Sequence, residues 1–67
     1  MVNNMFNEIR VNISDSIDEL SFIVADIDIS FDLGVEISED DIENYIDKIA
    51  TVIASLETDK ENLESLL

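Results

Sequence analysis

Cysteine, histidine and proline are all absent from the 67 residues of this chain, and Gly34 is its only glycine. Without cysteine there is no disulfide framework, no thiolate metal site and no cysteine nucleophile. Without histidine, the usual general base and the commonest neutral metal ligand are missing too. Carboxylates are plentiful, but no spacing singles out a catalytic pair, and so short a chain has little room for a deep pocket. We therefore expect a protein that is not an enzyme and that holds neither a cofactor nor a metal.

Positive charge is almost absent. Arg10, Lys48 and Lys60 face 17 acidic residues, which gives a formal net charge of −14. Such a charge opposes binding to nucleic acid phosphates or to an anionic membrane. Long apolar runs are also missing, since the longest covers residues 22–25, so we expect neither a signal peptide nor a membrane span and place the protein in the cytoplasm. Because 46% of the residues are hydrophobic, the chain differs from an acidic disordered tail, and we predict one small acidic domain over residues 1–67.

Residues 38–56 carry the clearest helical pattern. Ser38 is a favourable N-cap, and Asp41 follows at the position of a capping box. Acidic residues fill the first turn, where the helix dipole favours negative charge, and Lys48 is expected on the outer face beside Glu43 and Asp47. Apolar residues recur every three or four positions and predict one buried stripe: Ile42, Tyr45, Ile46, Ile49, Val52, Ile53 and Leu56.

A second helix is predicted upstream, capped by Ser14 or Asp15 and ending at Gly34. Its three-four spacing is typical of a helix that packs lengthwise on another helix, through Ile13, Ile17, Leu20, Val24, Ile27 and Phe31. Phe22, Ile29 and Leu33 fall on a different side, which a second subunit would have to cover. We therefore predict a mainly α fold, an antiparallel helical hairpin that dimerises into a bundle.

The ends of these helices are less well defined. Residues 1–13 fit a strand or a helix, and we predict a short helical start. Residues 35–37 should form a short extended connection after Gly34. The tail from residue 57 to residue 67 either continues the helix or forms a separate one capped by Thr58.

Residues 26–37 also support a different fold. Apolar residues alternate strictly with polar residues or glycine in DIDISFDLGVEI, which is the pattern of a half-buried strand. Asp, Ser and Ile are in addition mediocre helix formers. The alternative is thus a small α+β fold with a strand or hairpin at 26–37, paired with residues 8–13.

The acidic residues are the strongest functional signal. Many lie three or four positions apart, so on a helix they would be neighbours despite the cost of like-charge repulsion. We hypothesise that this field binds a basic protein surface, as a nucleic-acid mimic that inhibits a nuclease, repressor or polymerase would. Phage-encoded antagonists of host or defence proteins offer the analogy. The candidate contact residues are Asp28, Asp32, Glu36, Glu39, Asp40, Asp41, Glu43 and Asp47.

Two segments give an alternative function. DSIDEL at residues 15–20 and FDLGVEISEDDIEN at residues 31–44 resemble the acyl carrier proteins, in which a serine in an Asp-Ser-Leu motif begins a helix and carries phosphopantetheine. The resemblance covers about half of the chain and implies that Ser16 is the attachment residue. A third possibility is a structural subunit with no interaction beyond its own dimer.

A calcium-like pattern begins at Asp28. Carboxylates and Ser30 occupy ligand positions of an EF-hand loop through Glu39, but Leu33 stands where that loop requires glycine. We interpret this pattern mainly as a coincidence in an acidic sequence.

Overall fold

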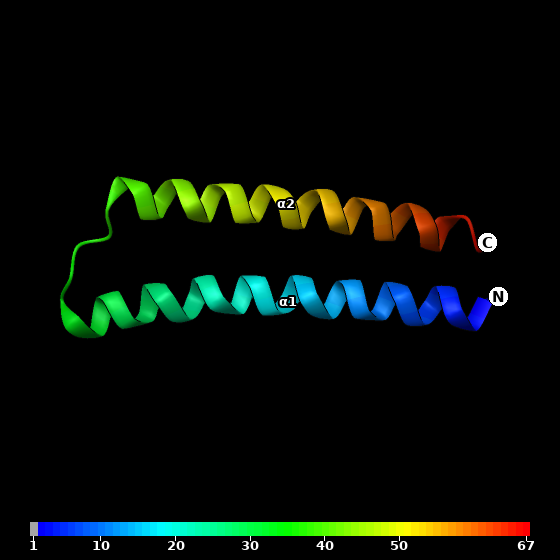
Figure 1. Ribbon diagram of the computed structural model, residues 1–67, viewed down its shortest axis with the longest axis horizontal. Helices are drawn as coiled ribbons and strands as arrows, with labels where there is room; N and C mark the ends of the chain where they lie inside the picture. The colour runs from blue at the N-terminus through cyan, green and yellow to red at the C-terminus, as the bar shows by residue number, and fades with distance from the viewer. Residues whose placement is uncertain (1) are drawn as a thin grey trace.

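The computed structural model describes residues 2–67 as two helices joined by a short connection (Figure 1). Helix α1 spans Val2–Leu33 and helix α2 spans Glu39–Glu64. The helices lie side by side and antiparallel, so the two chain ends lie together at the end opposite the connection. The hairpin measures 49 × 18 × 13 Å. The predicted mainly α hairpin is confirmed.

The strand alternative is wrong, because the structure contains no strand in residues 2–67 and residues 26–33 form the last turns of α1. A strand there would need a partner for its backbone N–H and C=O groups. Residues 8–13, the partner that we considered, are themselves helical and cannot supply one. The alternating pattern is accommodated instead by a helix that has apolar residues on several sides.

The separate second helix beginning at Ser14 or Asp15 is also wrong. Helix α1 runs without interruption from Val2, and both residues lie in its middle. No proline or glycine interrupts this segment, and starting a new helix would repeat the unfavourable nucleation step. The helical start predicted for residues 1–13 is therefore confirmed from Val2 onward but belongs to α1; Met1 lies outside the described residues.

The connection between the helices follows the prediction. Gly34 adopts a φ of +65°, and its N–H donates to the Phe31 carbonyl at 3.2 Å while the Val35 N–H donates to the Ser30 carbonyl at 2.9 Å. This pair of bonds is a Schellman motif, which satisfies carbonyls at the end of α1. Ser38 then caps α2, because its hydroxyl accepts the Asp41 N–H at 3.1 Å.

The tail continues α2 rather than forming a separate helix. Helix α2 reaches Glu64, and the Ser65 N–H still donates to the Glu61 carbonyl at 3.0 Å. Thr58 does not cap a new helix, since its hydroxyl donates to the Ala54 carbonyl one turn earlier. The tail therefore lengthens the hairpin by about two turns.

A narrow seam joins the two helices. Among the side chains that the structure describes, Ile9, Ile23 and Val52 are the buried apolar ones, with Ser16 and Asp59 buried beside them. Seven-residue steps separate Ile9, Ser16 and Ile23 on α1, and also Val52 and Asp59 on α2, which is the repeat of helices that supercoil around each other.

The apolar stripes that we predicted to form this seam mostly face outward. Val24, Phe31, Ile46 and Ile53 are each more than half exposed, as is Ile17. On α1 the residues in the seam are Ile9, Ser16 and Ile23, which are neighbours of the predicted stripe around the helix. On α2 the seam includes Val52 and Tyr45, which belong to the predicted stripe. Polar residues share the seam: Ser16 is buried in it, and Asn12 donates a hydrogen bond to the buried Asp59.

Candidate functional site

One broad side of the hairpin is apolar across both helices, and we call it the apolar face. Helix periodicity places its residues on the same side, next to the seam. From α1 it takes Phe6, Ile13, Ile17, Leu20, Val24, Ile27 and Phe31. From α2 it takes Ile42, Ile46, Ile49, Ile53, Leu56 and Leu63.

A hollow lined by both helices shows that the two stripes form one surface. Phe6 and Ile13 of α1 line a shallow hollow together with Leu56 and Leu63 of α2. Most of the side chains on this face are exposed, and Ile13 and Ile27 are half-buried. Contiguous apolar surface of this extent is typical of interaction sites.

Charge is arranged around this face. Along the helical rows of the apolar face, Arg10 and Lys60 lie near the chain ends and Glu39 lies at the start of α2. Asp28, Asp59 and Glu64 line hollows together with apolar side chains of this face. The half of the hairpin that contains the connection, residues 18–51, holds eleven carboxylates and one lysine. The other half holds six carboxylates with one arginine and one lysine. The molecule is therefore most negative at the connection.

All eight candidate contact residues are exposed around the connection. Two lie at the end of α1, one in the connection and five in the first turns of α2, where Asp40, Glu43 and Asp47 follow one outer edge. Within residues 2–67 the one ion pair joins Lys60 to Glu64 at 3.6 Å, so basic side chains of this region pair with none of the eight.

Lys48 lies elsewhere than expected. We predicted it on the outer face beside Glu43 and Asp47, but its Nζ lies 4.4 Å from the centroid of the Phe22 ring on α1. This cation–π contact spans the side of the hairpin opposite the apolar face, and Lys48 is half-buried there. Phe22 belongs to the α1 residues that we expected a second subunit to cover, and it is partly covered by this lysine instead.

Two polar pairs tie the helices together on that same side. The Tyr45 hydroxyl donates a hydrogen bond to Asp26 Oδ2, and Asn12 Nδ2 donates to Asp59 Oδ1 at 3.4 Å. Asp59 is only 2% exposed, and its Oδ2 has no hydrogen-bond partner within residues 2–67. Buried polar groups are normally paired, so this carboxylate is a costly feature of the seam. Its neighbours in the sequence, Glu57, Thr58, Lys60 and Glu61, are all polar or charged and gave no sign that Asp59 is buried.

The Tyr45–Asp26 hydrogen bond has a consequence that can be measured by titration. The bond, followed by burial and by the negative charge of Asp26, raises the pKa of Tyr45 from 10 to about 12. Because the folded pKa is the higher one, this contribution to stability is complete below pH 10 and is lost as the pH rises toward 12. Tyr45 is the only tyrosine and tryptophan is absent, so phenolate absorbance reports this residue alone.

We expect the absorbance titration of the folded chain to have its midpoint near pH 12. Asp26→Asn removes the charge that opposes ionisation, so its midpoint should move back toward 10. Asp28→Asn, two residues further along α1 on an exposed side of the helix, is the matched control and should keep the high midpoint. A midpoint near 10 in the unsubstituted protein, with its helicity intact, contradicts the bond.

Ser16 lies in an unsuitable place for the acyl-carrier alternative. It is 5% exposed and faces the seam in the middle of α1, not at a helix start. A serine that receives phosphopantetheine must offer its hydroxyl to an enzyme, and this one would have to leave the interface between the helices. The structure therefore argues against Ser16 as the attachment residue.

The calcium-like pattern is dispersed over three elements. Asp28, Ser30 and Asp32 lie on α1, Glu36 lies in the connection and Glu39 begins α2, so these residues do not surround one point. Over the described chain, no group of three or more carboxylates is placed to hold a metal ion. Within residues 2–67, neither helix is long and apolar enough to cross a membrane.

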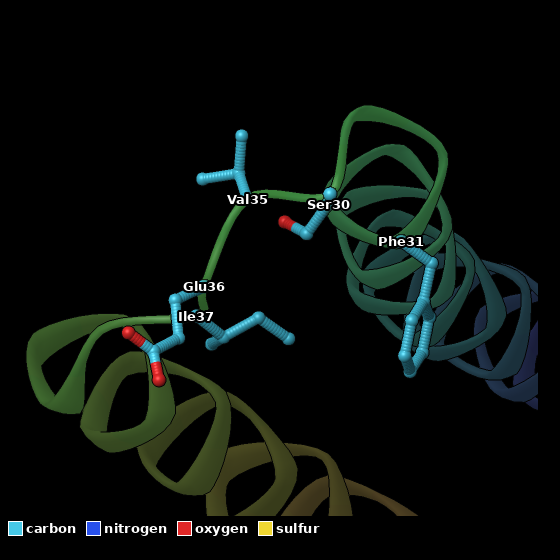
Figure 2. A pocket seen from close by; sticks show the side chains of 6 residues that line it. Ser30, Phe31, Val35, Glu36 and Ile37 are labelled. Atoms are coloured by element: carbon cyan, nitrogen blue, oxygen red, sulfur yellow. The ribbon is translucent and has the colours of Figure 1, made fainter.

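A second hollow lies under the connection and is shown in Figure 2. The side chain of Ile37 extends toward α1, whereas Val35 points away from both helices and the Glu36 carboxylate lies over the start of α2. Phe31 stands on the outer surface of α1 at the same end. The end of the hairpin thus combines exposed apolar side chains with its highest density of carboxylates.

Comparison with protein-family models, with curated proteins and with solved structures gave no match for this chain. Its function must therefore be argued from the two surfaces described above.

Proposed function

We propose that the protein is a small acidic binding module that docks the connection end of its hairpin on a basic protein surface. The observation that carries the proposal is the separation of charge along the molecule. Eleven carboxylates lie in residues 18–51, the half of the hairpin that contains the connection, and Lys48, the one basic residue there, lies over the Phe22 ring. Unpaired carboxylates at this density create a potential that attracts cationic surfaces over several ångströms.

The kind of partner follows from the same arrangement. Carboxylates three or four residues apart on α2 are about 5–6 Å from one another, a spacing similar in scale to that of phosphates along a nucleic acid strand. A groove that holds nucleic acid would offer lysine and arginine at complementary positions. A nuclease, repressor or polymerase is thus the class of protein that we propose as the target, with the hairpin as its inhibitor.

The first experiment is a capture assay with the full chain attached through a terminal tag, so that the connection is free. We expect basic proteins to be retained from the host lysate at low salt and released at moderate salt, because exposed charge pairs are screened over about 8 Å at physiological ionic strength. The binding constant of the purified partner is then measured with charge-reversed variants.

Asp40→Lys combined with Asp47→Lys should weaken binding at low salt at least about tenfold, since both residues lie on the outer edge of α2 near the connection. The matched control is Glu57→Lys with Glu64→Lys, which has the same spacing and the same change in net charge at the far end of α2. Circular dichroism verifies that both proteins remain helical. Equal losses in the two variants, or binding that ignores salt, contradict docking through the connection end.

A further inference from the structure

We propose that the apolar face is covered by a second copy of this chain, packed face to face with the two connections at opposite ends, so that four helices form one bundle. This inference depends on the apolar face and not on the basic partner proposed above. It also differs from the dimer expected from the sequence, which assigned the interface to Phe22, Ile29 and Leu33.

The exposed area is too large for a monomer of this size. The hairpin has an accessible surface of 5377 Å². A folded monomeric protein of 7.6 kDa exposes about 4,300 Å², so the hairpin exposes roughly 1,100 Å² in excess. A stable interface of standard size buries about 800 Å² per partner, and the broad side of the hairpin, 49 Å long and 18 Å wide, offers roughly 900 Å². One face-to-face contact therefore accounts for the excess.

Charge indicates that the cover is another copy of the same chain. Two copies carry the same strong negative charge and would repel each other through any surface rich in carboxylates. The rows of the apolar face carry one carboxylate, Glu39 at the start of α2, and Asp28, Asp59 and Glu64 line hollows beside these rows. The middle of the face is apolar, so it is where two copies can approach closely. The Lys48–Phe22 side, by contrast, carries Glu8, Asp15 and Glu19 along α1.

The uneven charge along the hairpin selects the orientation. If both connections lay at the same end, their carboxylate-rich halves would be stacked on each other. With the connections at opposite ends, each negative half lies over the half that contains Arg10 and Lys60. Helix α1 then crosses α1 of the second copy, which brings Arg10 near Asp28 of that copy. Helix α2 likewise crosses its counterpart, which brings Lys60 near Glu43.

This arrangement predicts which residues meet themselves across the two-fold axis. Ile17 and Ile53 lie close to the midpoints of α1 and α2, on the part of each helix that points straight out of the apolar face. Each should therefore contact its own counterpart in the second copy. With both connections at the same end, Ile17 would instead contact Ile53.

The chain has no cysteine, so single cysteines test the orientation directly. We expect Ile17→Cys and Ile53→Cys each to form a covalent dimer with a short bis-maleimide, whereas Ile29→Cys on another side of α1 should not. Crosslinking only when the Ile17→Cys and Ile53→Cys proteins are mixed would overturn the orientation. Crosslinking through Ile29→Cys alone would move the interface to another side and overturn the proposal.

The oligomeric state is tested with a matched pair of variants, measured by light scattering after size exclusion. The unsubstituted chain should have twice the 7.6 kDa mass, as expected of a two-fold symmetric dimer. Ile17→Lys places a charge inside the interface and should weaken dimerisation about 100-fold or more. Ile29→Lys is the control, because Ile29 and Ile17 lie on the same helix and are almost equally exposed, at 56% and 57%. This control should weaken dimerisation by less than about threefold.

Other occupants of the face give different results. A chain that stays monomeric and helical at high micromolar concentration overturns the proposal, as does a monomer that binds neutral lipid vesicles through the same residues. If Ile17→Lys unfolds, crosslinking of Ile17→Cys still shows whether the apolar face forms the dimer interface, because cysteine keeps the site apolar. A melting temperature that rises with protein concentration supports the dimer, and one that does not rise contradicts it.

Discussion

Replacing Ile23 by alanine should lower the free energy of unfolding by about 2–5 kcal/mol, because the substitution empties part of a seam that holds few apolar side chains. Ile23 is 6% exposed and lies in the seam on α1, one heptad after Ser16. A domain of this length has only about 3–5 kcal/mol to lose, so much of the variant should be unfolded at 37 °C. Urea denaturation followed by circular dichroism measures the change.

Ile29→Ala is the control for this experiment. It removes the same atoms from the same helix, but Ile29 is more than half exposed and touches the seam far less, so its effect should stay within about 0.5 kcal/mol. Both variants are compared at one protein concentration, because dimerisation makes apparent stability depend on concentration. Similar losses in the two variants would place the seam elsewhere on α1.

Replacing Asp59 by asparagine should have the opposite sign and stabilise the protein. The buried carboxylate leaves Oδ2 without a partner, and such a group costs about 1–3 kcal/mol, more when it is charged. Asparagine keeps the shape, and its amide oxygen can still accept the hydrogen bond from Asn12. Its NH2 then occupies the position of Oδ2, so the expected gain comes from removal of the buried charge. We expect a gain of about 1–2 kcal/mol, which raises the melting temperature by several degrees in a chain of this size.

The control must separate burial from net charge, since removing any carboxylate also relieves repulsion. Asp47→Asn makes the same change in charge at an exposed position of α2 and should raise the melting temperature by much less. If the two variants are equally stabilised, the carboxylate of Asp59 is not desolvated in solution and the seam is open to water there.

Local signals were sufficient for the ends of the helices. Ser38 and Gly34 act through hydrogen bonds to backbone groups only a few residues away, so the sequence around them contains all the information that the prediction needs. The start of α1 was predicted less well. The cap at Ser14 or Asp15 indicated a new helix there, but helical continuity is a cooperative property that a single favourable cap does not override.

The packing of the hairpin could not be predicted in the same way. Two neighbouring heptad stripes run along α1, one through Ile13, Ile17 and Leu20 and one through Ile9, Ser16 and Ile23. The more apolar stripe looked like the contact with α2, but periodicity shows only that a stripe is apolar and not which partner covers it. The seam uses the less apolar stripe, so the most hydrophobic residues remain exposed on the apolar face.

The candidate site was predicted in its chemistry but not in its geometry. Counting charges was enough to find the acidic residues around Asp40 and to expect them in solvent. Their concentration at one end depends on where the chain reverses, which only the fold reveals. The contact of Lys48 with Phe22 and the burial of Asp59 join residues far apart in sequence, and no local pattern predicts such pairs.

The connection at one end of a rod 49 Å long has a consequence for the two proposals taken together. A pair of hairpins with opposed connections is bivalent, because it carries one acidic tip at each extremity. Such a particle can bridge two target molecules or span two sites on one target, and its avidity then exceeds the strength of either tip alone. Separating the dimer into monomers with Ile17→Lys should therefore lower the apparent affinity more on a sensor surface densely coated with target than on a sparsely coated one.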